Sequence, residues 1–128
     1  MARVEILVSL KDEILKKFKE ESKIIFKLMF SLQENHSKGK ILGSISGILI
    51  KELKYKNFRF YFITDGFKSK CVDEQELTDL LLKFVRMSDK NQQQQTIEEI
   101  KQVLRTMGAG GFRQNHRNFS NTLTSFNP

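Results

Sequence analysis

Hydrophobic residues recur at every third or fourth position in the N-terminal third of the chain. This spacing places them on one face of a helix and predicts helical structure over residues 9–34. The segment is either one helix or a helical hairpin that breaks near residues 20–22, and Ser9 is its predicted N-cap. Just before it, residues 3–8 are rich in β-branched side chains and predict a first strand. The stripe runs through Leu15, Phe18, Ser22, Ile25, Met29 and Leu32.

The middle of the chain follows a period of two, in which neighbouring side chains belong to opposite faces. Residues 48–56 and 58–63 alternate in this way, and Asn57 lies between them as a turn residue. Two alternating runs joined by a short turn predict a β-hairpin. The polar, glycine-bearing segment 35–47 before the hairpin is predicted to be a loop.

After the hairpin the pattern permits more than one structure. A polar segment over 67–78 leads into a short apolar run that fits a helix and equally fits a buried strand over 79–86. Residues 96–107 then form an amphipathic pattern that predicts a helix, with Thr96 as its N-cap. The glycine-rich residues 108–111 are predicted to end that helix.

These elements divide the chain into one domain over residues 1–108 and a flexible basic tail over residues 109–128. The tail lacks a periodic apolar pattern and carries Arg113, His116 and Arg117 with no acidic residue. Such composition is typical of a mobile terminus. A chain of 128 residues is long enough for one such domain with its own core.

Composition narrows the range of functions. The formal net charge is +7, from 22 Lys and Arg against 15 Asp and Glu, which favours polyanionic partners such as nucleic acid.

Cys71 is the single cysteine, so an internal disulfide and a cysteine-based zinc site are both excluded, and a reducing cytoplasm is the expected setting. The sequence has no apolar run long enough to cross a membrane and no recognisable signal peptide, and we expect no membrane partner. Common phosphate-loop, zinc-protease and serine-hydrolase motifs do not occur in it.

Three short motifs carry a family resemblance. The first is Glu52-Leu53-Lys54 followed after a turn by Phe58-Arg59-Phe60-Tyr61-Phe62. The second is the run from Leu80 to Lys90, and the third is Thr96-Ile97-Glu98-Glu99-Ile100. Together with the order of elements, they resemble the RelE/ParE toxin superfamily, and its phage-derived, HigB-like branch most closely. The resemblance covers residues 3–107.

The resemblance implies an α+β fold, in which a small, twisted, mainly antiparallel sheet packs against an N-terminal helix or helix pair. It also implies that residues 79–86 form a strand. Toxins of the RelE kind cut mRNA in the ribosomal A site, whereas ParE relatives inhibit DNA gyrase, and an antitoxin normally holds both. Arg59 matches the hairpin arginine that contacts the scissile phosphate in active members. Lys54 matches a basic position of the first motif, and Arg86 or Lys90 matches the basic residue after the last strand.

Metal-free RNA cleavage by a 2′-hydroxyl needs a proton acceptor, a proton donor and positive charge at the phosphorane. Arg59 and Tyr61 lie two residues apart and therefore share a strand face, and Tyr61 is the candidate proton carrier. Whether Lys54 shares that face depends on the register of the hairpin. Arg59, Lys54, Arg86 and Tyr61 are thus the candidate catalytic residues, without metal or cofactor. The cations expected to contact RNA are Lys51, Lys56, Lys83 and Lys90.

Three functions follow from these observations. The first is a toxin that acts as a ribosome-dependent mRNA endonuclease and has the ribosome, mRNA and a cognate antitoxin as partners. The second is a non-catalytic protein of the same fold, either a ParE-like gyrase inhibitor or a degenerate interaction protein. The third is a basic nucleic-acid-binding module unrelated to toxins.

The sequence departs from the RelE pattern at two places. Ile50 and Glu52 lie where the RelE type carries further lysines, and residues 92–96 lack the tyrosine or histidine that active members often carry there.

Overall fold

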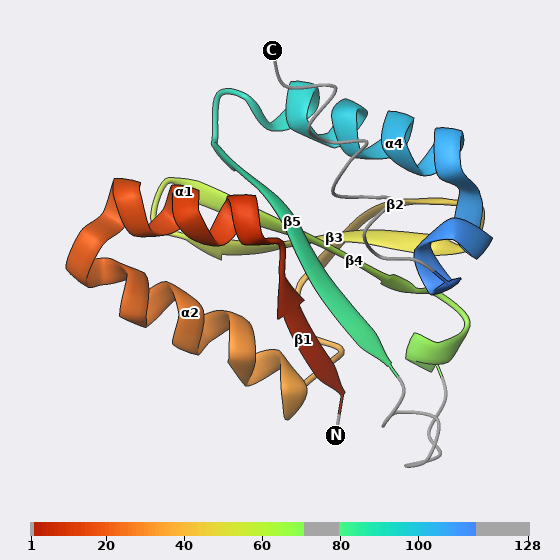
Figure 1. Ribbon diagram of the computed structural model, residues 1–128, viewed down its shortest axis with the longest axis horizontal. Helices are drawn as coiled ribbons and strands as arrows, with labels where there is room; N and C mark the ends of the chain where they lie inside the picture. The colour runs from red at the N-terminus through yellow and green to blue at the C-terminus, as the bar shows by residue number, and fades with distance from the viewer. Residues whose placement is uncertain (1, 71–79, 115–128) are drawn as a thin grey trace.

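The computed structural model describes residues 2–70 and 80–114 and has an α+β architecture (Figure 1). A five-stranded mixed sheet carries a helix pair on one face and a long C-terminal helix on the other. In chain order, the principal elements are β1 (Arg3–Ile6), α1 (Val8–Phe18), α2 (Ser22–Phe30), β2 (Lys40–Ile45), β3 (Ile48–Tyr55), β4 (Phe58–Asp65), β5 (Leu81–Asp89) and α4 (Gln93–Gln114).

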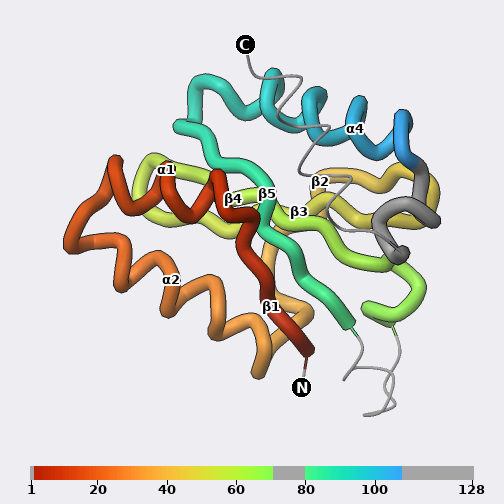
Figure 2. Tube along the Cα trace, in the orientation of Figure 1, coloured from red at the N-terminus to blue at the C-terminus, as the bar shows by residue number. Residues whose placement is uncertain are grey.

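The sheet has the strand order β1-β5-β4-β3-β2. The pairs β5–β4, β4–β3 and β3–β2 are antiparallel, while β1 pairs with β5 in parallel, so the first and last strands of the chain lie side by side (Figure 2). The predicted α+β class and mainly antiparallel sheet are therefore confirmed.

The N-terminal helical segment is a hairpin. A short 3₁₀ turn, Lys19–Glu21, separates α1 from α2, and Lys19 adopts a φ of 51°, which interrupts the helical path. The Ser22 hydroxyl donates a hydrogen bond to the Ile14 carbonyl across the break. Of the two alternatives that the sequence leaves open, the structure therefore has the hairpin, with the break at Lys19–Glu21. Ser9 is not the N-cap, because α1 already begins at Val8 and Lys11 N–H bonds the Leu7 carbonyl at 2.9 Å.

The prediction of a loop over residues 35–47 is wrong in its second half, where β2 forms. This strand lies at the edge of the sheet, and its register on β3 shifts between Ile41 and Gly43. Hydrogen bonds with β3 hold this segment in an extended conformation, which its polar, glycine-bearing sequence does not predict. An edge strand needs no regular alternation of buried and exposed residues, so the period-two signal is missing.

The predicted β-hairpin is confirmed and forms the centre of the sheet. Strands β3 and β4 pair from Ile48 with Asp65 to Tyr55 with Phe58, and a two-residue turn of Lys56 and Asn57 joins them. Lys56 adopts the left-handed conformation that such tight turns require, with φ of 54°.

The strand alternative for the ambiguous run is also confirmed, since β5 spans Leu81–Asp89. The strand continues to Asp89, past the predicted end at residue 86. Of the preceding polar segment, Lys68–Lys70 form a 3₁₀ turn, and residues 71–79, which include Cys71, lie outside the described residues.

The last helix is longer than its sequence predicts at both ends. Thr96 lies inside α4, where its hydroxyl donates to the Gln92 carbonyl at 2.9 Å, so it is not the N-cap. The Asp89 carboxylate instead accepts the backbone N–H groups of Asn91 and Gln92 just before the helix. Residues 108–111 do not end the helix, since glycine lowers helix stability by about 1 kcal/mol relative to alanine but does not forbid helical backbone. Residues 115–128 of the predicted tail lie outside the described residues.

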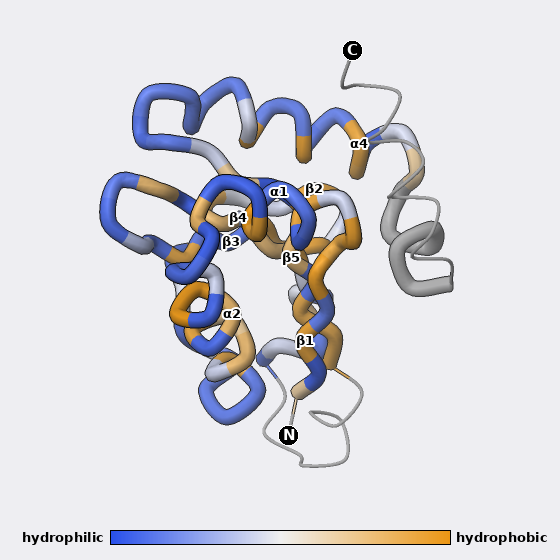
Figure 3. The backbone as a smooth tube through the Cα atoms, turned by 60° about the vertical axis from the view of Figure 1, so that its left-hand side comes forward, coloured by the Kyte–Doolittle hydropathy of each residue, from blue (hydrophilic) through white to orange (hydrophobic). Residues whose placement is uncertain are grey.

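The sheet separates two hydrophobic layers. On one face, Phe18 of α1 meets the rings of Phe58 and Phe60 at centroid distances of 4.9 and 6.1 Å. On the other face, α4 packs Ile97, Ile100, Val103 and Leu104 into the core, and Figure 3 shows its hydrophobic positions turned toward the sheet. No helix within the described residues is long and apolar enough to span a membrane.

Candidate functional site

The hairpin register brings the predicted cations together on the face of the sheet that carries α4. Lys54 is the direct cross-strand partner of Arg59, and Tyr61 is the partner of both Glu52 and Arg86. Directly opposed residues share a face, as do residues two apart on one strand. Lys54, Arg59 and Arg86 therefore project from three adjacent strands on one face, and we call these three residues the cationic site.

A glutamate lies beside each arginine of the cationic site. Arg59 Nε is 3.9 Å from Glu52 Oε1, and these side chains are only 12% and 10% exposed. Arg86 Nε is 3.5 Å from Glu99 Oε2, which α4 contributes. Both arginines are thereby oriented and partly neutralised, so an incoming phosphate must compete with these carboxylates.

A polar pocket of about 240 Å³ opens above Arg86, between α1, β5 and the first turns of α4. Glu13 and Glu99 line it together with Arg86. Desolvation raises the pKa of Glu13, while the positive charges of Arg86 and Lys17 act in the opposite direction. Arg86 thus lies at the boundary between the sheet face and a pocket that also contains acidic groups. The remaining lining residues are Met87, Gln92, Gln95 and Thr96.

Tyr61 is on the expected face but has no exposed surface. Its hydroxyl lies 2.8 Å from Ser88 Oγ, which itself donates to the Asp89 carbonyl at 2.8 Å. The Tyr61 O–H is therefore the donor in this pair. Burial is the main cause that raises the pKa of Tyr61, and the negative charge of Glu52 acts in the same direction, while the positive charge of Arg59 opposes it. In this conformation the hydroxyl cannot reach a substrate, and its role is to hold β4 against β5.

For the RNA cleavage that the family resemblance implies, Tyr61→Phe should therefore leave the rate within a few-fold of the parent. The substitution keeps the ring and removes one buried hydrogen bond, so it should lower the free energy of unfolding by about 1 kcal/mol. Urea unfolding and an RNA-cleavage assay measure the two effects. A loss of activity by two orders of magnitude in a folded Tyr61→Phe protein would show that the hydroxyl takes part in chemistry.

Two of the four lysines expected to contact RNA lie away from the cationic site. Lys51 is buried on the opposite face, where its Nζ lies 3.3 Å from the Ser37 carbonyl and 5.5 Å above the Phe62 ring. Lys83 is buried on β5 and pairs in register with Glu5 of β1. Burial lowers the pKa of both lysines.

The other two lysines lie at the same end of the sheet as the cationic site. Lys56, in the turn between β3 and β4, forms an ion pair with Glu21 of 2.9 Å, and its hydrogen bond with that carboxylate raises the pKa of Lys56. Lys90 is exposed directly after β5. Both can contact a long polyanion that extends beyond the site.

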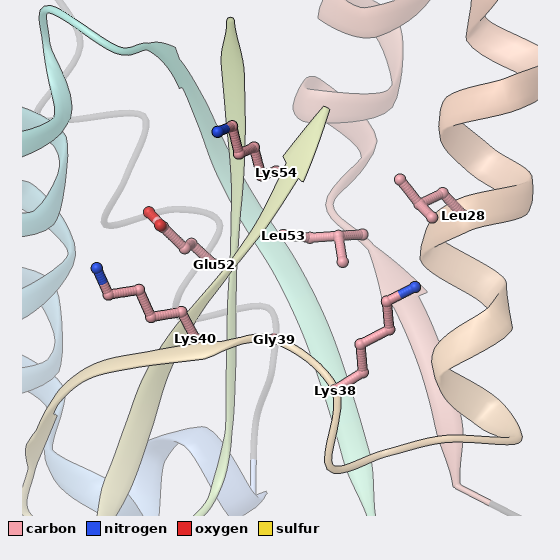
Figure 4. Close-up of a pocket in the computed structure, with 7 residues that line it drawn as sticks. All are labelled: Leu28, Lys38, Gly39, Lys40, Glu52, Leu53 and Lys54. Atoms are coloured by element: carbon pink, nitrogen blue, oxygen red, sulfur yellow. The ribbon is translucent and has the colours of Figure 1, made fainter. Parts of the chain in front are cut away.

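The sequence did not point to a second feature, an open pocket of about 520 Å³ next to Lys54 (Figure 4). Its wall includes Lys38 and Lys40, which flank the start of β2, and Lys40 pairs in register with Glu52. Because residues 35–47 were expected to be a loop, nothing placed these lysines beside the hairpin. Glu99 was likewise not identified, since only the packing of α4 brings it to Arg86. The other lining residues are Leu28, Gly39, Glu52, Leu53 and Lys54.

Comparisons with family models, with curated proteins and with solved structures found no match for this chain. Within the described residues, no group of three or more His, Cys, Asp or Glu side chains could hold a metal ion. In the cationic site the Lys54 ammonium is exposed, whereas the side chains of Arg59 and Arg86 are only 12% and 10% exposed, so a phosphate would have to displace Glu52 and Glu99 to reach their guanidinium forks.

Proposed function

We propose that the protein is a toxin of the RelE/ParE kind that cuts mRNA on the ribosome in the cytoplasm and is controlled by a cognate antitoxin. The observation that carries the proposal is the register that places Lys54, Arg59 and Arg86 on one face of three adjacent strands. This is the arrangement expected if the first two motifs of the sequence form one phosphate-binding site. The net charge of +7 supports a polyanionic partner.

In this proposal the 2′-hydroxyl of the RNA attacks the adjacent phosphorus, a P–O bond forms, and the bond to the 5′-oxygen breaks. The proton of the 2′-hydroxyl leaves and another is delivered to the 5′-oxygen. Arg59 and Arg86 stabilise the extra negative charge of the phosphorane. Lys54 is the exposed group beside Arg59 that can exchange protons, and the ribosome holds the RNA in line for attack.

A second candidate is inhibition of a DNA-handling enzyme such as gyrase by binding alone. The observation that favours it is the position of the acidic residues, because Glu52 and Glu99 each lie beside an arginine of the cationic site. The burial of Tyr61 also favours binding without chemistry, because a buried hydroxyl cannot act as the proton carrier. A surface of this kind can bind a charged partner without chemistry.

Controlled expression in bacterial cells separates the two candidates. A ribosome-dependent nuclease should arrest growth and produce new mRNA 5′ ends within translated regions, which mapping of transcript ends would detect. Growth arrest with intact transcripts and altered plasmid supercoiling would support the gyrase candidate instead. Expression of a variant with Arg59→Ala and Glu52→Gln is the control for both readouts.

A further inference from the structure

The pocket beside Lys54 lies at the edge of the sheet, at the point where β2 begins and β3 extends beyond it. Strand β2 begins at Lys40, opposite Glu52, so residues 53–55 of β3 extend beyond it. Figure 4 shows the pocket at this step, with Lys40, Glu52 and Lys54 on the side of α4 and Lys38 on the side of the helix pair. The pocket therefore crosses the sheet edge and reaches the cationic site through Lys54.

The wall of this pocket combines an apolar floor with a cationic rim. Leu53 is buried and Leu28 is half-buried, and Figure 4 shows the two leucine side chains facing each other. Lys38, Lys40 and Lys54 are exposed around them. Among the described residues that line the pocket, Glu52 is the acidic one, and its carboxylate lies beside Arg59. We call the set Leu28, Lys38, Lys40, Leu53 and Lys54 the lysine groove.

Gly39 brings the two outer lysines close to β3. It has a φ of 105°, and a Cβ at this position would lie 2.9 Å from Phe62 Cζ and 3.2 Å from the Glu52 carbonyl oxygen. Any other residue would force the chain away from the hairpin. The backbone at Gly39 lies close to β3, and the side chains of Lys38 and Lys40 point to opposite sides of the sheet edge (Figure 4).

We propose that the lysine groove binds the RNA nucleotide next to the phosphate held at the cationic site. The base lies against Leu28 and Leu53, and the flanking phosphates contact the lysines. This inference rests on the proposed function and adds to it the path of the substrate. It also requires single-stranded RNA, because only an unpaired base can leave its stack and enter a pocket.

Size and charge both favour a nucleotide as the occupant. A volume of about 520 Å³ falls within the range of roughly 300–1,000 Å³ that is common for small-molecule sites. An acidic peptide would satisfy the lysines but would not need an apolar floor between them. A nucleotide has an apolar base face and a phosphate on each side, which matches the order of groups along the groove.

Binding of a non-cleavable oligonucleotide tests the groove directly. The probe is a fluorescent 2′-O-methyl RNA, which cannot be cut because it lacks the attacking hydroxyl. The parent should bind it with strong salt dependence, and Lys38→Ala/Lys40→Ala should lower the slope of log K against log salt by about 1.4, since each phosphate contact to a single strand contributes about 0.7. Lys68→Ala/Lys70→Ala removes the same charge beyond the other end of β4 and should leave the slope unchanged.

The outcomes separate this inference from the proposed function. If the parent binds the oligonucleotide and the Lys38/Lys40 variant keeps the parental slope, the groove is not the RNA path, while the nuclease proposal stands. If the parent binds a glutamate-rich peptide more tightly than the oligonucleotide, the occupant is a protein and the inference is wrong. If the parent binds no RNA at any salt concentration, the inference is wrong, while the proposed function is decided separately by the mapping of transcript ends in cells. An equal loss of slope in the Lys68/Lys70 control would also overturn the inference, because it would show a general charge effect.

Discussion

Arg59→Ala combined with Glu52→Gln should lower the rate of RNA cleavage by roughly 10²–10³-fold while the protein stays folded. Removal of one preformed electrostatic contact to the transition state typically has an effect of this size. Arg59→Lys should restore only part of the rate, because an ammonium group cannot contact two phosphate oxygens with the planar fork of a guanidinium. The measurements are the cleavage rate and the midpoint of urea unfolding for each variant.

The second substitution in this experiment is required by the surroundings of Arg59. Glu52 is only 10% exposed, and its Oε2 has no hydrogen-bond partner among the described residues. Arg59→Ala alone would leave this carboxylate buried without its cation and should lower stability by on the order of 1–3 kcal/mol. Glu52→Gln alone keeps Arg59 and removes a competitor for the phosphate, so it should cleave RNA at least as fast as the parent. A folded double variant with parental activity would show that Arg59 does not contact the reacting phosphate.

Phe60→Ala should lower the free energy of unfolding by about 3–5 kcal/mol, the largest effect that we expect on stability. Phe60 follows Arg59 directly, yet it points to the opposite face of the sheet, has no exposed surface and packs against Phe18. Removing a buried ring loses its burial and leaves a cavity. Chemical denaturation measures the effect.

Phe67→Ala is the matched control, because Phe67 is 77% exposed. The same chemical change there should alter stability by less than about 0.5 kcal/mol. Equal destabilisation by Phe60→Ala and Phe67→Ala would contradict the core described for this face of the sheet.

Local patterns in the sequence predict the elements that carry a strong period. The apolar stripe of the helix pair and the alternation in the hairpin are of this kind. The hairpin is confirmed, and the stripe is confirmed at Ser22, Ile25, Met29 and Leu32, but it is wrong at Leu15, which is exposed while Leu10 and Ile14 of the same helix are buried. Strand β2 has no such period, because an edge strand derives its order from pairing with β3. The ends of α4 also differ from the predicted ones, because Asp89 accepts the N–H groups of Asn91 and Gln92 just before the helix begins at Gln93, and Gly108, Gly110 and Gly111 lie within the helix.

The candidate site could be predicted only in part, for a related reason. Residue spacing placed Arg59 and Tyr61 on one face, but the contribution of Lys54 depended on a register that only the paired strands reveal. Burial of Tyr61, the approach of Glu99 to Arg86 and the position of Lys40 opposite Glu52 all arise from contacts between distant segments. Sequence patterns report periodicity along the chain and contain little information about such contacts.

Cleavage of one mRNA in free and ribosome-bound form by the purified protein tests the central proposal most directly. The cationic site contains two arginines and an exposed lysine. These residues do not form a general acid–base pair of their own, so efficient cleavage requires the ribosome to position the RNA. We expect cuts within the ribosome-bound message, little cleavage of the free message, and loss of the cuts in the Arg59→Ala/Glu52→Gln variant. Efficient cleavage of free RNA, or an intact message on the ribosome with the folded parent protein, would contradict the proposal.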